Sequence, residues 1–120
     1  MASLRIAASI NDTTNNSTVG TSSLTVTTAA AYEYKEVKAI GTTEESIALP
    51  ADLTGAGAGY LYVKNRDATN YVQIGTATTV YWMRLKAGEV AVLPLDNAIT
   101  TLYLKANTAA CDVEVYARSR

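Results

Sequence analysis

The sequence contains no histidine, no phenylalanine and a single cysteine among its 120 residues. Without histidine, the chain lacks the commonest general base, the usual metal ligand and every catalytic triad that depends on an imidazole. With Cys111 alone, neither an intrachain disulfide nor a thiol-based metal site can form. Cys111 lies in an apolar strand pattern, so we interpret it as a small buried side chain rather than a reactive thiol.

Long apolar runs and an excess of either charge are also missing. No stretch approaches the roughly twenty apolar residues that cross a membrane, and the apolar start at residues 4–10 is too short for a signal peptide. Residues 1–50 carry a net charge of -2 (three basic, five acidic) and residues 51–120 carry +1 (seven basic, six acidic). Neither half has the basic excess that nucleic-acid binding requires. We therefore expect no membrane partner and no nucleic-acid partner.

Carboxylates are the remaining candidates for chemistry. A pair of them could hydrolyse a glycosidic bond, but most of the 11 acidic residues fall in turns or at outward strand positions. Residues 55–59 are rich in glycine, yet no Lys-Ser/Thr and no helix follow them, so they are not a phosphate-binding loop. Asn11, Asp12 and the asparagines after them lack the acidic spacing of a calcium loop. We expect no catalytic residues, no metal site and no cofactor, and a hydrolase that uses carboxylates alone stays an alternative without specific support.

The residues that are abundant favour strands. Val, Leu, Ile, Ala and Thr occur with eight Tyr and one Trp, and β-branched residues and tyrosine fit a pleated surface. No segment of ten or more residues has a helical period. Short strands separated by turns predict an all-β fold, a β-sandwich of jelly-roll type. We expect these strands at residues 32–40, 46–50, 59–65, 70–75, 80–85, 90–94, 101–106 and 111–117.

Six of these strands are close enough in sequence to form three hairpins. We expect residues 59–65 to pair with 70–75, residues 80–85 with 90–94, and residues 101–106 with 111–117. The inward side chains would be Leu61 with Val63, Val72 with Ile74, and Val113 with Val115 and Ala117. A β-bulge near Lys35 and Glu36 would bring the tyrosines and the later Val37 and Ala39 of the first strand to one side.

The first 28 residues differ from the rest, because Asn, Thr, Ser and Gly dominate from residue 11 to residue 28. Such a segment cannot bury enough apolar surface to order itself. We predict an extended N-terminal arm over residues 1–28, with one or two short strands, and a β-sandwich domain over residues 29–120. The arm must lie on its own domain, on a neighbouring subunit or on a partner. We predict that contacts outside its own β-domain order it, with Leu4, Ile6 and Ile10 as anchors.

Four aromatic residues are candidates for binding, because they alternate with core positions. Tyr60 and Tyr62 lie opposite Leu61 and Val63, Tyr103 lies between two leucines, and Trp82 shares a strand side with charged residues. Outward Tyr and Trp are typical of protein interfaces and of sugar-binding platforms. Three interpretations stay open: filler within the sheets, a protein–protein interface, or a carbohydrate platform.

Several segments of the C-terminal half share a pattern of strand and turn. They are Tyr60-Leu61-Tyr62-Val63-Lys64-Asn65, Thr69-Asn70-Tyr71-Val72-Gln73-Ile74-Gly75, Met83-Arg84-Leu85-Lys86-Ala87-Gly88-Glu89 running into Val90-Ala91-Val92-Leu93-Pro94-Leu95, Leu102-Tyr103-Leu104-Lys105-Ala106 and Cys111-Asp112-Val113-Glu114-Val115-Tyr116-Ala117. Together these segments, about half of the chain, resemble small β-domain proteins of tailed-bacteriophage virions.

The resemblance implies a role in assembly and no enzymatic activity. Such proteins form oligomers, often trimers, that bind the outer capsid surface or another virion component. We therefore expect a capsid decoration or cement protein on the capsid surface of a virion. Its partners would be the major capsid protein and, in a homotrimer, further copies of itself. A carbohydrate-binding or tail- or fibre-associated virion β-domain is the alternative.

Overall fold

The computed structural model describes residues 2–20, 24–28, 33–50, 59–96 and 98–119. This part of the chain consists of strands, turns and bends, and it contains no helix long and apolar enough to cross a membrane. The chain divides into two compact units, Met1–Ala31 with Arg120 and Tyr32–Ser119. We call them the N-terminal unit and the sandwich unit. The predicted all-β class is confirmed.

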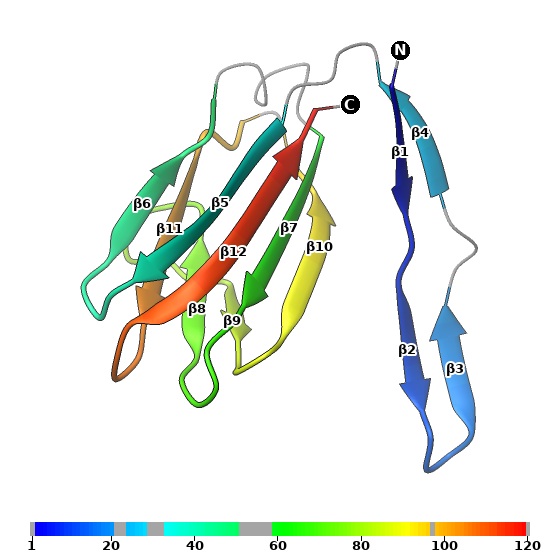
Figure 1. Ribbon diagram of the computed structural model, residues 1–120, viewed down its shortest axis with the longest axis horizontal. Coiled ribbons are helices and arrows are strands. Elements are labelled where there is room, and N and C mark those ends of the chain that lie inside the picture. Colours follow the sequence, from blue (N-terminus) through cyan, green and yellow to red (C-terminus); the bar gives the residue numbers. More distant parts are fainter. Residues whose placement is uncertain (1, 21–23, 29–32, 51–58, 97, 120) are drawn as a thin grey trace. The chain divides into compact units, whose positions relative to one another are not determined.

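The sandwich unit consists of two antiparallel sheets (Figure 1). Within the described residues, the first sheet has the strand order β10-β7-β12-β5 and the second sheet has the order β6-β11-β8-β9. The predicted β-sandwich is therefore confirmed. Its strands are β5 (Glu33–Ile40), β6 (Glu45–Ala48), β7 (Tyr60–Asn65), β8 (Val72–Gly75), β9 (Met83–Leu85), β10 (Val90–Pro94), β11 (Thr101–Ala106) and β12 (Cys111–Arg118).

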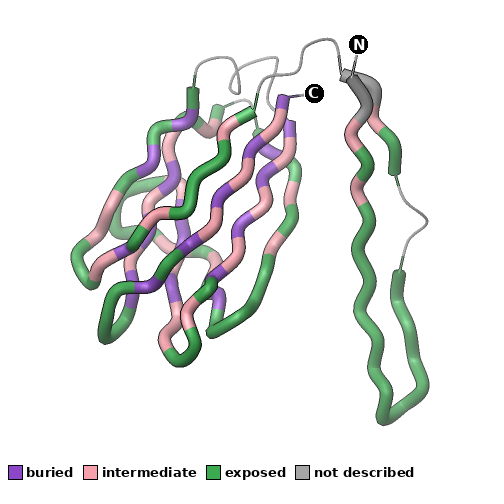
Figure 2. The backbone as a smooth tube through the Cα atoms, in the orientation of Figure 1, coloured by how far each residue is buried: buried purple, intermediate pink, exposed green. Residues whose placement is uncertain are grey.

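Inward side chains of both sheets form one apolar core. Successive residues of a strand point to opposite sides, and buried and outward residues accordingly alternate along β7, β11 and β12 (Figure 2). Cys111 is fully buried as expected, and burial raises the pKa of its thiol, which disfavours the reactive thiolate. The inward positions predicted from the sequence are confirmed for Leu61, Val63, Val72, Ile74, Val113, Val115 and Ala117.

The three predicted hairpins are wrong, because the two strands of each pair lie in different sheets. The chain changes sheet between β7 and β8, between β9 and β10, and between β11 and β12. Apolar alternation shows which side of a strand faces the core, but a hairpin and a change of sheet bury the same side chains. A connection of a few residues can also span the roughly 10 Å between stacked sheets. The sequence pattern therefore identifies each strand but not its neighbour.

The predicted bulge in β5 is also wrong. The register between β5 and β12 is unbroken along the ladder, so Val37 and Ala39 point outward, and Val37 is 49% exposed. Glu36 and Lys38 have the inward parity instead. β5 is an edge strand of the first sheet, and charged side chains at such positions oppose pairing with a further strand.

Asn65 is fully buried at the end of β7, where it joins two connections. Its Nδ2 donates to the carbonyl oxygens of Asn70 at 2.8 Å and of Leu85 at 3.1 Å. Its Oδ1 accepts a hydrogen bond from the backbone N–H of Asp67 at 3.0 Å, and its own N–H donates to the carbonyl of Glu89 at 3.0 Å. One residue thereby links the β7–β8 connection and the β9–β10 turn across the two sheets.

Replacement of Asn65 by leucine should destabilise the sandwich unit strongly. The leucine has a similar size, but it removes the donor to the part-buried carbonyl of Asn70 and to the buried carbonyl of Leu85, which should lower the free energy of unfolding by about 3 kcal/mol. Urea denaturation measures this loss. The matched control is Gln73→Leu on the outward side of β8, which should change stability by less than about 0.5 kcal/mol. Equal losses for the two variants would contradict the role of Asn65.

The N-terminal unit contains more strands than its polar composition predicts. Its described residues form four strands rather than one or two, and these make two antiparallel ladders, β1 with β4 and β2 with β3. The Asp12 carboxylate fixes the turn after β2 by accepting hydrogen bonds from the N–H groups of Thr14 at 3.0 Å and Asn15 at 3.1 Å. Because Asp and Asn stabilise turns with their own side chains, a polar run can form a hairpin. The strands are β1 (Ala2–Ile6), β2 (Ser9–Asp12), β3 (Ser17–Gly20) and β4 (Leu24–Thr28).

Candidate interaction surfaces

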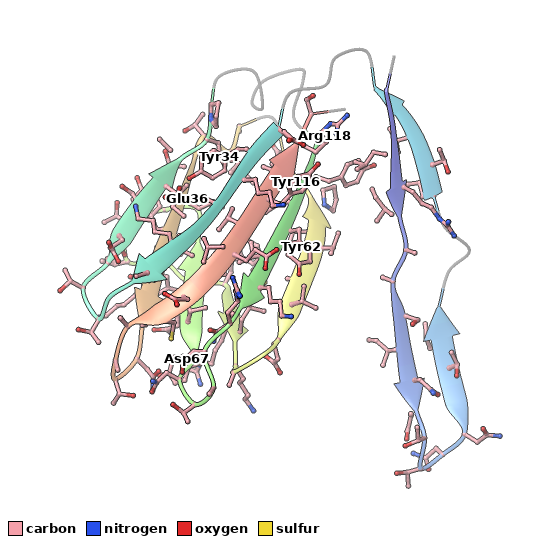
Figure 3. The ribbon with its side chains drawn as sticks, viewed as in Figure 1. Tyr34, Glu36, Tyr62, Asp67, Tyr116 and Arg118 are labelled. Atoms are coloured by element: carbon pink, nitrogen blue, oxygen red, sulfur yellow. The ribbon has the colours of Figure 1, made fainter. Side chains whose placement is uncertain are left out.

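The outward side of the first sheet carries a patch of valine and tyrosine side chains. Its register places Val92 opposite Tyr62, and Tyr62 opposite Tyr116. Figure 3 shows both tyrosines on this sheet. Val90 is 52% exposed and Val92 is 45% exposed. We call it the valine–tyrosine face, and its members are Val37, Tyr60, Tyr62, Val90, Val92 and Tyr116.

Charged residues of both signs interleave with this face. Lys64 is directly opposite Glu114 in the ladder between β7 and β12. The guanidinium of Arg118 lies 3.9 Å from the carboxylate of Glu33, which also accepts a hydrogen bond from the Tyr116 hydroxyl at 3.1 Å. Lys35 is on the same side, opposite Tyr116 on the edge strand β5, and has no oppositely charged cross-strand neighbour. A partner could cover the paired charges without burying a lone charge if Lys35 stays at the rim of the contact.

The outward side of the second sheet is more polar, and the connection between β8 and β9 approaches it closely. A Cβ on Gly75 would lie 1.8 Å from the carbonyl oxygen of Val80, so only glycine allows this approach. The N–H of Trp82 donates to the carbonyl of Ile74 at 3.1 Å and closes the connection against β8. The outward strand residues beside it are Ser46, Gln73, Tyr103 and Lys105.

Glu44, which precedes β6, holds the same connection with its carboxylate. Its Oε2 accepts hydrogen bonds from the N–H of Thr79 at 2.8 Å and from the hydroxyl of Tyr81. Thr79 has a φ of 58°, which β-branched residues rarely adopt, and the bond to Glu44 stabilises that conformation. The hydrogen bond from Tyr81 to Glu44, together with burial, raises the pKa of Tyr81 to about 12.

Trp82 and Arg84 lie beside this connection at the β9 edge of the second sheet. Trp82 is 51% exposed. The guanidinium carbon of Arg84 lies 4.3 Å from the centre of the Tyr71 ring, which is a cation–π contact. This cluster offers one flat aromatic surface and one oriented cation, and it is the part of the second sheet best suited to bind a polar ligand.

The four aromatic residues predicted for binding do not form one row. Tyr60 and Tyr62 lie on the outward side of the first sheet, whereas Tyr103 and Trp82 belong to the second sheet and its β8–β9 connection. The outer faces of a sandwich point away from each other. A single flat ligand therefore cannot contact all four residues at once.

The predicted anchor residues Leu4, Ile6 and Ile10 lie in the N-terminal unit, each opposite another apolar residue. Leu4 and Ile6 share one side of β1, and Ile10 belongs to β2, which follows β1 after two intervening residues. Ile10 is 76% exposed, and its cross-strand partner Val19 is 72% exposed. We call this set the apolar stripe, and its cross-strand pairs are Leu4 with Val26, Ile6 with Leu24, and Ile10 with Val19.

Sequence reasoning missed Val37, Val90 and Val92 as surface residues. In residues 90–93 both parities are apolar, so alternation could not tell the inner side from the outer side. The register with β7 supplies the answer, because Ala91 and Leu93 lie opposite buried residues while Val90 and Val92 lie opposite outward ones. That information depends on long-range pairing rather than on local pattern.

Neither a metal cluster nor a relative points to an activity. Within the described ranges, no group of three or more His, Cys, Asp or Glu residues is placed to hold a metal ion. The glycine-rich residues 55–58 lie outside those ranges. No family model, no curated protein and no solved structure matches the chain. Function is therefore inferred from the surfaces.

The Tyr81 contact predicts a loss of stability in alkaline solution. The ordinary pKa of a tyrosine phenol is 10.0, whereas the pKa of Tyr81 in the folded chain is about 12. Between these values the unfolded chain releases a proton that the folded chain retains, so stability should fall as pH rises from 10 towards 12. Tyr81→Phe should flatten this fall in thermal denaturation experiments across that range.

Tyr34→Phe is the matched comparison, because burial and Glu36 also raise the pKa of Tyr34 to about 12. It should flatten the curve in the same direction, and the double variant should show the smallest fall. If both single variants follow the wild-type curve above pH 10, the two contacts do not set the alkaline stability.

Proposed function

We propose that the chain is a structural protein of a tailed-bacteriophage virion that decorates the capsid. In this proposal it lies on the capsid surface and binds the outer side of major capsid protein subunits. The strand order of the sandwich unit is the observation that carries the proposal. The resemblance of the C-terminal half to small virion β-domains adds to it.

The strand order supports a jelly-roll description of the sandwich unit. The first strand of the unit pairs with the last, β5 with β12, and the second pairs with the second last, β6 with β11. β7 then pairs with β10, and β8 with β9. This nesting is that of one long hairpin wrapped into two sheets, and jelly rolls are common in viral capsid proteins and in lectins.

The surfaces favour a binding role over a catalytic one. The sandwich unit has an exposed valine–tyrosine face, and the N-terminal unit exposes apolar side chains on ladders of two strands. Isolated two-stranded ladders are at best marginally stable in water. We therefore propose that the protein assembles as a homotrimer and that contacts outside the sandwich unit of the same chain order its N-terminal residues.

Copy number in purified virions tests the capsid proposal. A decoration protein binds along the whole shell, so its molar amount should be close to that of the major capsid protein. Quantitative mass spectrometry of particles, with a tail protein as the internal reference, measures this ratio. A copy number that matches the tail protein would remove the capsid assignment and favour a tail or fibre component.

A carbohydrate-binding domain is the second candidate, and the cluster of Trp82, Arg84 and Tyr71 is the observation that favours it. An exposed indole can stack on a sugar ring, and an adjacent cation can hold an acidic sugar. If this function applies, a glycan array should show binding that Trp82→Ala abolishes while Tyr62→Ala, on the first sheet, leaves it unchanged. Absence of binding by the folded protein across a broad array would remove the candidate.

A further inference from the structure

The valine–tyrosine face and the apolar stripe are two exposed apolar surfaces of one chain. On the stripe, Ile10, Val19 and Leu24 are 76%, 72% and 53% exposed. On the face, Val90 and Val92 are 52% and 45% exposed. Exposed apolar patches of this kind mark interaction sites in soluble proteins.

The apolar stripe and the valine–tyrosine face are similar in length, and their charges are compatible with a contact between them. From Leu4 to Ile10 the stripe is about 20 Å long at ~3.3 Å per residue, and β7, with six residues, has about the same length. The stripe itself contains no charged residue. The charges of the face have opposite neighbours, Lys64 with Glu114 and Arg118 with Glu33. Lys35 is on the same outward side, opposite Tyr116 on the edge strand β5. The contact would therefore bury apolar area without an isolated charge in its centre, while the long side chain of Lys35 stays at the rim and reaches water.

The edges of the sandwich are less suited to this contact than the face. β5 has the charged Glu36 and Lys38 at inward positions of an edge strand. The two edge strands of the second sheet are short, with four residues in β6 and three in β9, and β10 ends at Pro94. Charged inward residues, short edge strands and proline all oppose the addition of a strand. Side-chain packing onto the face avoids these obstacles.

We propose that the apolar stripe of one chain docks on the valine–tyrosine face of a second copy and forms a third β-layer there. Each chain carries one stripe and one face, so a ring of copies can satisfy every surface through a closed heterologous interface. Stacked sheets lie roughly 10 Å apart, which valine, isoleucine and tyrosine side chains fill. This inference rests on the proposed structural role and names the surfaces through which the proposed homotrimer assembles.

Charge insertion on the stripe tests the contact with a close control. Ile10→Asp places a carboxylate on the stripe, whereas Asn11→Asp places the same charge on the opposite side of β2 and keeps an oxygen acceptor for the Thr18 hydroxyl. In sedimentation velocity experiments on the full chain, Ile10→Asp should weaken self-association by about a hundredfold or more. Asn11→Asp should leave it within about threefold. Equal association of the two variants would overturn the proposal.

The same comparison applies to the receiving face. Val92→Asp lies on the valine–tyrosine face, and Ala48→Asp lies at an exposed position of β6, an edge strand of the second sheet. Val92→Asp should weaken self-association as strongly as Ile10→Asp, and Ala48→Asp should not. Circular dichroism and thermal denaturation of each variant check that the sandwich unit remains folded. Normal association of folded Val92→Asp would show that another surface receives the stripe.

Cross-linking distinguishes a second copy from docking within one chain. Chains with Ile10→Cys and a mass tag are mixed with untagged chains carrying Val92→Cys, and a short bis-maleimide is added. The buried Cys111 should not react, which the wild-type protein checks. A product that joins a tagged chain to an untagged chain supports the proposal. A second arm uses a variant that carries both Ile10→Cys and Val92→Cys. If cross-links form only within single chains of this variant and none joins two chains, the proposal is overturned in favour of docking within one chain.

Binding to virions separates this inference from the proposed function. If wild-type chains associate through stripe and face but no phage particle incorporates them, the inference stands and the capsid proposal fails. If the wild-type protein is monomeric and Ile10→Asp abolishes its binding to particles, the stripe binds another virion protein. That result would overturn the inference while the capsid proposal stands.

Discussion

The sandwich depends on hydrogen-bond partners for the backbone groups of the connections between its sheets, and the buried side-chain amide of Asn65 provides several of them. When consecutive strands lie in opposite sheets, their connections cross the end of the core, where backbone groups lose water and need internal partners. Asn65, at the end of the first-sheet strand β7, supplies two donors and one acceptor at that point, and its side chain reaches backbone groups of the β7–β8 connection and of β9 in the second sheet. The β11–β12 connection is tied to the same end, because Asn107 and Tyr71 exchange hydrogen bonds of 2.9 and 3.2 Å. The order of strands is thus stabilised by polar contacts at one end as well as by apolar burial between the sheets.

Local pattern predicted the parts of the fold that depend on single strands. The alternation in β7, β8 and β12 identified their buried side chains correctly, since the side of a strand follows from parity alone. Partners of strands depend on contacts between distant residues, and here the sequence suggested hairpins that do not form. In β5 the apolar Val37 and Ala39 suggested an inward side, but the unbroken ladder with β12 places the charged Glu36 and Lys38 there instead. The ladder with β12, and not the local apolar pattern, decides which side of β5 faces inward.

The candidate surfaces, like the fold, could be predicted from the sequence only where the pattern within one strand decides which side faces outward. Tyr60 and Tyr62 could be assigned outward because Leu61 and Val63 were evident core residues. The valines of β10 could not, because its two sides are both apolar and its register with β7 decides which one is buried. The separation of Trp82 from Tyr62 also required the sheet order, since outward parity is shared by residues on opposite outer faces. In the N-terminal unit, the Asp12 carboxylate stabilises the turn between β2 and β3. The polar composition of this segment did not predict that hairpin.

The two outer faces differ in what they leave available, and that difference favours association through the first sheet. On the second sheet, the connection between β8 and β9 comes within contact of Gly75 and is held by Glu44, so part of that face is already in use. The first sheet keeps Val90 and Val92 exposed, with charges in opposite pairs around them. The charged inward residues of the edge strand β5 oppose the addition of a further strand, whereas the outward surface of the same sheet stays exposed. The sheet can therefore pack against a partner through its surface without being extended at that edge. The proposed assembly in many copies would benefit from this division between a protected edge and an open face.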